Sequence, residues 1–160
     1  MPPHMTVYLV RHADAKGRSA WDGADHLRPL TKKGLQQSVA LVDLFANANI
    51  RRALSSPAVR CVDTLKPLGS ARDIPVEPVD ALAEGSDPKA AMAVLADAAA
   101  KKGDSVLCMH GDLVPELLRR LTKSGVKLLD PPRWAKGSTW VLSTDGGAIK
   151  DGHYLPPPGG

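Results

Sequence analysis

Arginine and histidine side chains follow apolar segments of this chain at three separate places. Arg11 and His12 come directly after the run Val7–Val10, Arg60 stands in the opening turn of a predicted helix, and His110 ends another apolar run. A guanidinium presents paired N–H donors that match phosphate oxygens, and an unprotonated imidazole can attack phosphorus to form a covalent intermediate. No acidic cluster stands among these residues. The sequence therefore predicts an anion site that uses no metal and no cofactor.

Strands and helices alternate over most of the length, and this alternation predicts the scaffold behind those side chains. A final hairpin is predicted around the turn Asp145-Gly146-Gly147. The pattern favours an α/β fold of three layers, α/β/α, with a mainly parallel sheet and an antiparallel edge hairpin. The predicted strands cover 7–10, 51–56, 74–79, 105–109, 138–144 and 147–155, and the predicted helices cover 31–48, 57–67, 87–103 and 112–125.

The carboxyl ends of parallel strands meet at one edge of such a sheet, where ligands bind. We therefore expect Arg11, His12, Arg60 and His110 to converge there. The helices that begin after Pro57 and Asp112 would add free N–H groups and the positive ends of their dipoles.

Length and charge limit the remaining possibilities. With 160 residues and no linker, we expect one domain over 1–160, with loose ends at 1–5 and 156–160. The net charge of +4 suits a small anionic substrate, and no long basic run points to a nucleic acid polymer. No signal-peptide core and no membrane-spanning run is present, so we expect a cytoplasmic protein without membrane partners. Cys61 and Cys108 are expected to be small buried residues.

Four motifs in order along the chain carry a resemblance to a known family. They are "LVRHADA", "PLTKKG", "SSPAVRCVDT" and "MHGD". Together they resemble the histidine phosphatase, or phosphoglycerate mutase-like, superfamily. The short chain without a cap insertion is similar to its SixA-type branch. "HGDLVPELL", "KGSTWVL" and "YLPPP" also resemble the C-terminal phosphatase-like domain of two-domain actinobacterial MutT proteins, which carry an N-terminal Nudix domain.

The resemblance implies specific roles for the residues of the opening paragraph. His12 would be the nucleophile, while Arg11, Arg60 and His110 would hold the phosphoryl oxygens. Neighbouring arginine charges should lower the pKa of His12 and keep its nitrogen unprotonated. The general acid is less clear: Glu84 in "LAEGSDP" is a candidate, but a solvated loop carboxylate is the alternative.

Further residues near these motifs are candidates for substrate binding. Asp14 could orient Arg11 or a donor in a loop, or be a solvated loop charge, and Thr64 could support Arg60 or lie on the helix surface. Trp21 and Trp134 could stack on an aromatic substrate or act as packing anchors. The full set of substrate-binding candidates is Asp14, Ser56, Thr64, Gly111, Lys136 and Ser138.

Three functions fit these observations. The first is a metal-independent phosphatase acting on a phosphohistidine protein or a nucleotide polyphosphate. The second is a nucleotide-binding or partner domain that acts in trans with a Nudix-type protein, since the chain contains no Nudix-like Glu-rich helix. The third is an interaction module with a relic site, against which the intact Arg11, His12, Arg60 and His110 argue.

Overall fold

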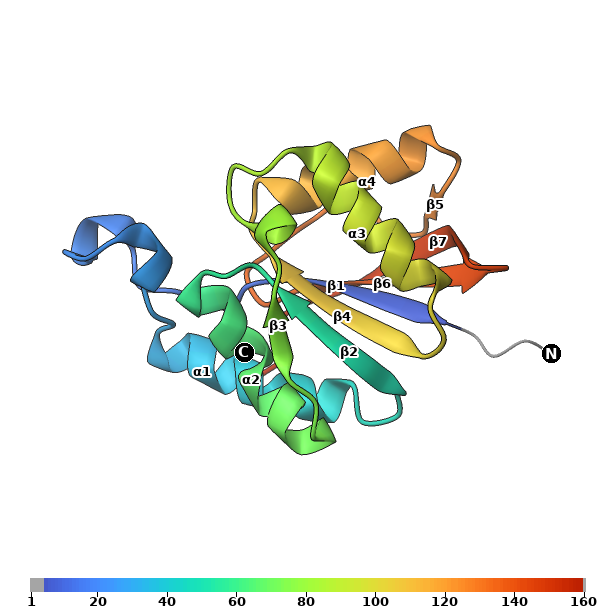
Figure 1. Ribbon diagram of the computed structural model, residues 1–160. Coiled ribbons are helices and arrows are strands. Elements are labelled where there is room, and N and C mark those ends of the chain that lie inside the picture. The colour runs from blue at the N-terminus through green and yellow to red at the C-terminus, as the bar shows by residue number, and fades with distance from the viewer. Residues whose placement is uncertain (1–4, 160) are drawn as a thin grey trace.

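A seven-stranded sheet forms the centre of the computed structural model, which describes residues 5–159 (Figure 1). The strand order is β3-β2-β4-β1-β6-β7-β5. The strands from β3 to β1 run parallel, and β6 and β7 form the predicted antiparallel hairpin beside β1. A short β5 pairs in parallel with β7 at the edge. The strand bounds are β1 Thr6–Arg11, β2 Ile50–Ser55, β3 Val76–Pro78, β4 Asp104–Met109, β5 Lys127–Leu128, β6 Thr139–Asp145 and β7 Ala148–Leu155.

Helices cover both faces of the sheet, which confirms the predicted three-layer α/β/α architecture. In Figure 1, α1 and α2 lie on one face, and α3 and α4 lie on the other. Their bounds are α1 Lys32–Leu44, α2 Val59–Arg72, α3 Pro88–Ala100 and α4 Leu113–Lys123.

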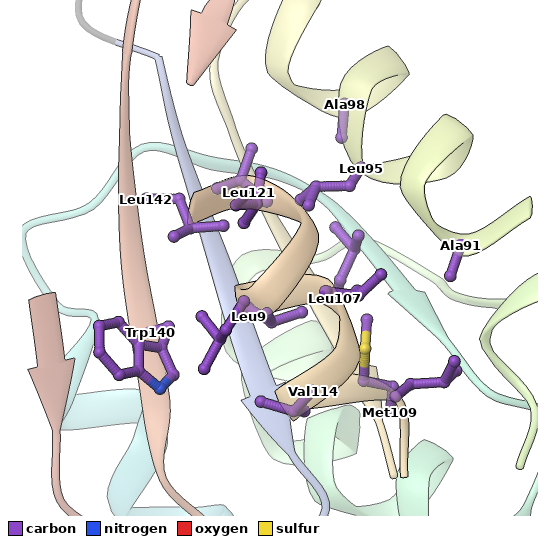
Figure 2. Close-up of a cluster of buried hydrophobic side chains, with 14 of the residues drawn as sticks. Leu9, Ala91, Leu95, Ala98, Leu107, Met109, Val114, Leu121, Trp140 and Leu142 are labelled. Carbon is purple, nitrogen blue, oxygen red and sulfur yellow. The ribbon is translucent and has the colours of Figure 1, made fainter. Parts of the chain in front are cut away.

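The two faces of β1 supply two separate hydrophobic cores, because successive side chains of a strand point to opposite sides. Leu9 belongs to the core under α3 and α4, and Val10 belongs to the core under α1 and α2. In the first core, Leu9 and Leu107 pack with Trp140 of β6 (Figure 2). The central strands are therefore packed on both faces, and this packing fixes the positions of the residues that follow their carboxyl ends.

Helix α2 differs from the sequence prediction, which ended it at Pro67. The helix continues through Pro67 to Arg72 and ends at Asp73, whose φ of 54° is left-handed. An interior proline removes one backbone hydrogen bond and strains the turn. Leu65 and Leu68, both fully buried, hold the helix against the sheet across that point. Tertiary packing thus overrides the local helix-breaking signal.

Two single-turn 3-10 helices, η1 (Arg18–Ala20) and η2 (Asp25–Leu27), order the polar segment before α1. The Thr31 side chain accepts from the backbone N–H of Gly34 and caps α1, as predicted. Gly34 permits a close approach, since a Cβ there would lie 1.9 Å from the Asp14 carbonyl oxygen. This contact holds the start of α1 against the loop that follows His12.

The end of the described chain is more ordered than predicted. Pro157 and Pro158 are half-buried, and Gly159 lies against Ala40 and Gln36 of α1. The predicted loose ends at 1–4 and 160 lie outside the described residues. None of the helices found between residues 5 and 159 has both the length and the apolar character needed to cross a membrane.

Candidate active site

A hollow of about 290 Å³ opens at the carboxyl ends of β1, β2 and β4. It contains five cationic side chains, two histidines and two carboxylates, so its charge favours an anion. The four residues that the sequence placed at this edge all line it. The complete lining is Arg11, His12, Gly17, Arg18, Arg28, Arg60, Glu84, His110, Gly111, Asp112 and Lys136.

The His12 ring is held in one tautomer by the next residue. Its Nδ1 lies 2.8 Å from the carbonyl oxygen of Ala13. A carbonyl can only accept, so Nδ1 carries the hydrogen and Nε2 keeps its lone pair. Burial lowers the pKa of His12 to about 3, against the raising effect of the Ala13 hydrogen bond and with help from His110, Arg60 and Arg11. His12 is therefore a neutral imidazole at physiological pH.

The Arg11 guanidinium is fixed between two loops. Its Nη1 donates to the Trp134 carbonyl over 2.8 Å, and its Nε is buried with no acceptor among residues 5–159. Gly111 lies against the guanidinium, and a Cβ at that position would come 2.6 Å from Arg11 Nη2. Any larger residue at 111 would displace Arg11 from the hollow.

Arg60 lies in the first turn of α2 and is 1% exposed. It donates to the carbonyl and carboxylate of Asp25, to the carboxylate of Glu84 and to Nδ1 of His110. Its Nε is also buried without an acceptor in the described part of the chain.

His110 is oriented by three partners. Its Nδ1 lies 3.3 Å from Arg60 Nη2, and its Nε2 lies 2.8 Å from Ser56 Oγ and 3.5 Å from Cys61 Sγ. A guanidinium can only donate, so Nδ1 accepts and the Nε2–H group donates to the serine hydroxyl. Ser56 is fully buried behind the ring and is absent from the hollow's lining. We expected Ser56 to bind substrate; the structure places its hydroxyl against His110 and outside the lining of the hollow.

Substituting Ser56 by alanine should lower kcat/KM about tenfold, because the His110 Nε2–H would lose its buried acceptor, a loss worth on the order of 1.4 kcal/mol. The measurement is steady-state kinetics on one phosphate substrate, alongside thermal unfolding. Ser55→Ala is the matched control, since Ser55 is equally buried but its hydroxyl donates to the Ser56 carbonyl instead. Equal losses of activity in the two variants would contradict the orienting role.

Three other candidates support the hollow from outside its lining. Thr64 Oγ1 donates to the Arg60 carbonyl and accepts from the backbone N–H of Ala13, tying α2 to the loop after His12. The Asp14 carboxylate accepts from the Thr31 hydroxyl. The Ser138 carbonyl accepts from the backbone N–H of Arg11. Asp14, Thr64 and Ser138 therefore contact segments that border the hollow and are not among its lining residues, so their contact with substrate stays a prediction.

Glu84 stands at the mouth of the hollow between two arginines. One carboxylate oxygen accepts from Arg18, and the other accepts from Arg60 over 3.0 Å. The loop that carries Glu84 is held by Asp112, whose carboxylate accepts from the backbone N–H of Gly85. Glu84 is therefore an exposed loop carboxylate that is held at the mouth of the hollow by ion pairs with Arg18 and Arg60.

Sequence reasoning missed Arg18, Asp25 and Arg28. Arg28 is 6% exposed and donates to the Lys16 carbonyl and to the Asp25 carboxylate. Asp25 in turn binds Arg60 from the far side of the hollow. The sequence signal that could have indicated these residues is the opposite-charge pair Asp25 and Arg28, which are three residues apart in a segment without apolar periodicity.

No group of three or more His, Cys, Asp or Glu side chains in the described range 5–159 is arranged to hold a metal ion. Glu84 and Asp25 contact arginines, and Asp112 accepts from the backbone N–H of Gly85.

Comparison with known proteins adds independent evidence. A sequence model of the histidine phosphatase superfamily (branch 1) matches residues 7–86. The 8-oxo-(d)GTP phosphatase of Mycolicibacterium smegmatis (strain ATCC 700084 / mc(2)155) is 34% identical over 156 residues. The match covers 96% of this chain and 48% of the relative, so the chain spans about half the length of that relative.

Solved structures share the fold. The protein histidine phosphatase SixA, complexed with tungstate, matches with a TM-score of 0.74 at 23% identity over 95% of each chain. A mycobacterial glucosyl-3-phosphoglycerate phosphatase matches with a TM-score of 0.69 at 15% identity, over 96% of this chain and 97% of the other. The predicted phosphoglycerate mutase-like fold is confirmed. With the ordered motifs and the family match over half of its length, the chain belongs to the histidine phosphatase superfamily, a family of phosphatases.

Proposed function

We propose that this phosphatase removes a phosphoryl group from its substrate through a covalent intermediate on Nε2 of His12, without a metal ion of its own. The observation that carries the proposal is the state of His12: buried, neutral, and held by Ala13 so that Nε2 is the nitrogen with the lone pair. Such a group can attack phosphorus without first losing a proton.

The reaction then proceeds in two displacements. The Nε2 lone pair of His12 forms a bond to phosphorus as the bond from phosphorus to the leaving group breaks, and the leaving group takes a proton. Water next attacks the phosphohistidine, releases inorganic phosphate and returns the electron pair to Nε2. The guanidinium groups of Arg11 and Arg60, which both line the hollow, are suited to hold the phosphoryl oxygens in both steps.

The surroundings of Glu84 favour substrates with good leaving groups. Both of its carboxylate oxygens accept from guanidinium groups, and such partners suit the carboxylate better than the acid. We therefore propose Glu84 as an electrostatic and positioning group, with a proton-donating role only for poorer leaving groups. Phosphoanhydrides and phosphohistidine leave without a strong acid.

Between those two substrates, a nucleoside polyphosphate is favoured. Lys136 lines the hollow in addition to Arg11 and Arg60 and forms no ion pair within residues 5–159, so a cation is available for a second phosphate. A relative that covers the chain almost completely is named an 8-oxo-(d)GTP phosphatase. Both observations support a substrate with consecutive phosphates.

A second candidate is a domain that acts in trans with a Nudix-type protein. This candidate comes from the motif resemblance to two-domain MutT proteins, and the chain spans about half the length of its curated relative. In that arrangement the partner would act on the triphosphate, and this chain would act on the diphosphate. Hydrolysis of a nucleoside triphosphate that appears only when a Nudix-type protein is added would favour this candidate.

A substrate panel tests the main proposal. We expect kcat/KM for nucleoside diphosphates to exceed that for sugar phosphates by about tenfold or more, the effect of one additional charged hydrogen bond. Turnover of acetyl phosphate should be the same with and without EDTA; nucleotides are unsuitable for that comparison because they bind magnesium themselves. Activity that vanishes with EDTA and returns with magnesium would contradict the metal-free mechanism.

A further inference from the structure

A second hollow, of about 580 Å³, lies between α4 and the segment that leads from β5 to β6. Its lining is largely apolar and includes Pro115 and Leu118 from the helix, and Leu128, Pro132 and Trp134 from the segment. Two cations of α4, Arg119 and Lys123, also line it. We call this hollow the α4 groove. The reaction at His12 uses none of these side chains.

The α4 groove adjoins the candidate active site along two connections. The Trp134 carbonyl accepts from Arg11 Nη1 over 2.8 Å, and Lys136, two residues further on, lines the active-site hollow. On the other side, Asp112 lines the active site, and Pro115, about one helical turn away, lines the groove. A ligand that starts at the phosphate site can therefore continue into the groove past Arg11.

The groove wall that carries Trp134 is held in place by its own contacts. The indole N–H of Trp140 donates to the Arg133 carbonyl over 2.7 Å, and the Arg133 guanidinium lies over the Tyr154 ring. The Asp130 carboxylate accepts from the Tyr154 backbone N–H. Trp134 itself remains 36% exposed on this anchored segment. An exposed indole on a rigid support is a suitable stacking surface.

We infer that the α4 groove binds the nucleoside part of the substrate, with the base stacked on Trp134 and packed against Leu118 and Pro115. The inference rests on the proposed phosphatase function and extends it to the leaving group. The chemistry supports a flat aromatic group over an aliphatic one, because the groove combines an indole face with the cations Lys123 and Arg119, of which Arg119 is paired with Glu116. Its volume falls within the range of small-molecule sites.

The test is the nucleoside preference, defined as kcat/KM for a nucleoside diphosphate divided by kcat/KM for acetyl phosphate. Trp134→Ala should lower this ratio about tenfold, since a base–aromatic stack contributes on the order of 1–3 kcal/mol. Trp134→Phe should retain most of it. Leu129→Ala is the matched control: Leu129 is 54% exposed on the same segment and does not line the groove. Equal loss on both substrates in Trp134→Ala would overturn the inference and leave the phosphatase proposal standing.

A binding measurement tests nucleoside binding in the α4 groove independently of the phosphatase activity. In His12→Ala, a nucleoside diphosphate should shift the indole N–H NMR signal of Trp134, which is assigned by its absence in Trp134→Phe, and should leave that of Trp140 in place. This readout does not need turnover, so it decides the inference even if neither substrate is hydrolysed. A nucleotide that binds without moving the Trp134 signal would overturn the groove assignment.

Discussion

His12→Ala should abolish turnover, with kcat falling by at least about a thousandfold, because no other described group at this site presents a neutral, preoriented imidazole nitrogen to phosphorus. The wild-type protein, quenched rapidly with labelled substrate, should carry an acid-labile, base-stable phosphoryl adduct on the peptide that contains His12. The variant should carry none. Rapid quench followed by peptide mass analysis under alkaline conditions measures both results.

Two controls keep this test specific. His153→Ala removes a half-buried histidine from β7, far from the lining of the active site, and should keep wild-type turnover and adduct. His12→Ala should still bind vanadate or phosphate, because Arg11, Arg60 and His110 remain. A stable adduct at another residue, or undiminished turnover without His12, would contradict the covalent mechanism.

Arg60→Lys should lower kcat/KM about tenfold to a hundredfold, although the charge is kept, because the lysine loses the planar fork and a charged hydrogen bond worth about 1.5–3 kcal/mol. The structure sharpens this expectation: the Arg60 guanidinium joins Asp25, Glu84 and His110 at a single point. An ammonium group cannot reach all three in the same geometry. Steady-state kinetics on one substrate, with vanadate affinity alongside, measure the loss.

Arg72→Lys is the matched control, because Arg72 lies on the same helix and donates to the Phe45 and Ala48 carbonyls at the end of α1. It should lower stability with little effect on kcat/KM. A wild-type rate in Arg60→Lys would mean that its fork does not take part in phosphate binding.

Coupling between the two arginines gives a stricter form of the same test. The double variant Arg11→Ala, Arg60→Ala should lose less activity than the product of the two single losses. Both arginines hold the same phosphoryl group, so either single substitution already disrupts most of the shared interaction. Four kcat/KM values on one substrate complete the cycle. Strict additivity with anion binding intact would contradict a shared phosphate, and the convergence of Arg11 and Arg60 on one group would have to be abandoned.

The sequence by itself determined the catalytic edge of the sheet. Val7–Val10 is apolar enough to be a central strand, and such a strand delivers the residue after it to the carboxyl edge. The same reasoning applies to Arg60 and His110, so their meeting with His12 was predictable from strand order and local pattern alone. The α/β/α layering and the hairpin were predictable for the same reason, since both follow from short-range periodicity and turn residues.

The tertiary structure decided which side chains touch. Ser56 and His110 are 54 residues apart, and only the parallel pairing of β2 with β4 brings the serine hydroxyl behind the imidazole. Asp25 and Arg28 lie in a segment without periodicity, and Asp25 ties this segment to α2 through its ion pair with Arg60. Helix α2 continues past Pro67 because the burial of Leu65 and Leu68 outweighs the loss of one backbone hydrogen bond at the proline. Local patterns specify where a strand or helix ends, whereas long-range packing and charge pairing specify the partners of each side chain, because those energies exist only once the chain has folded.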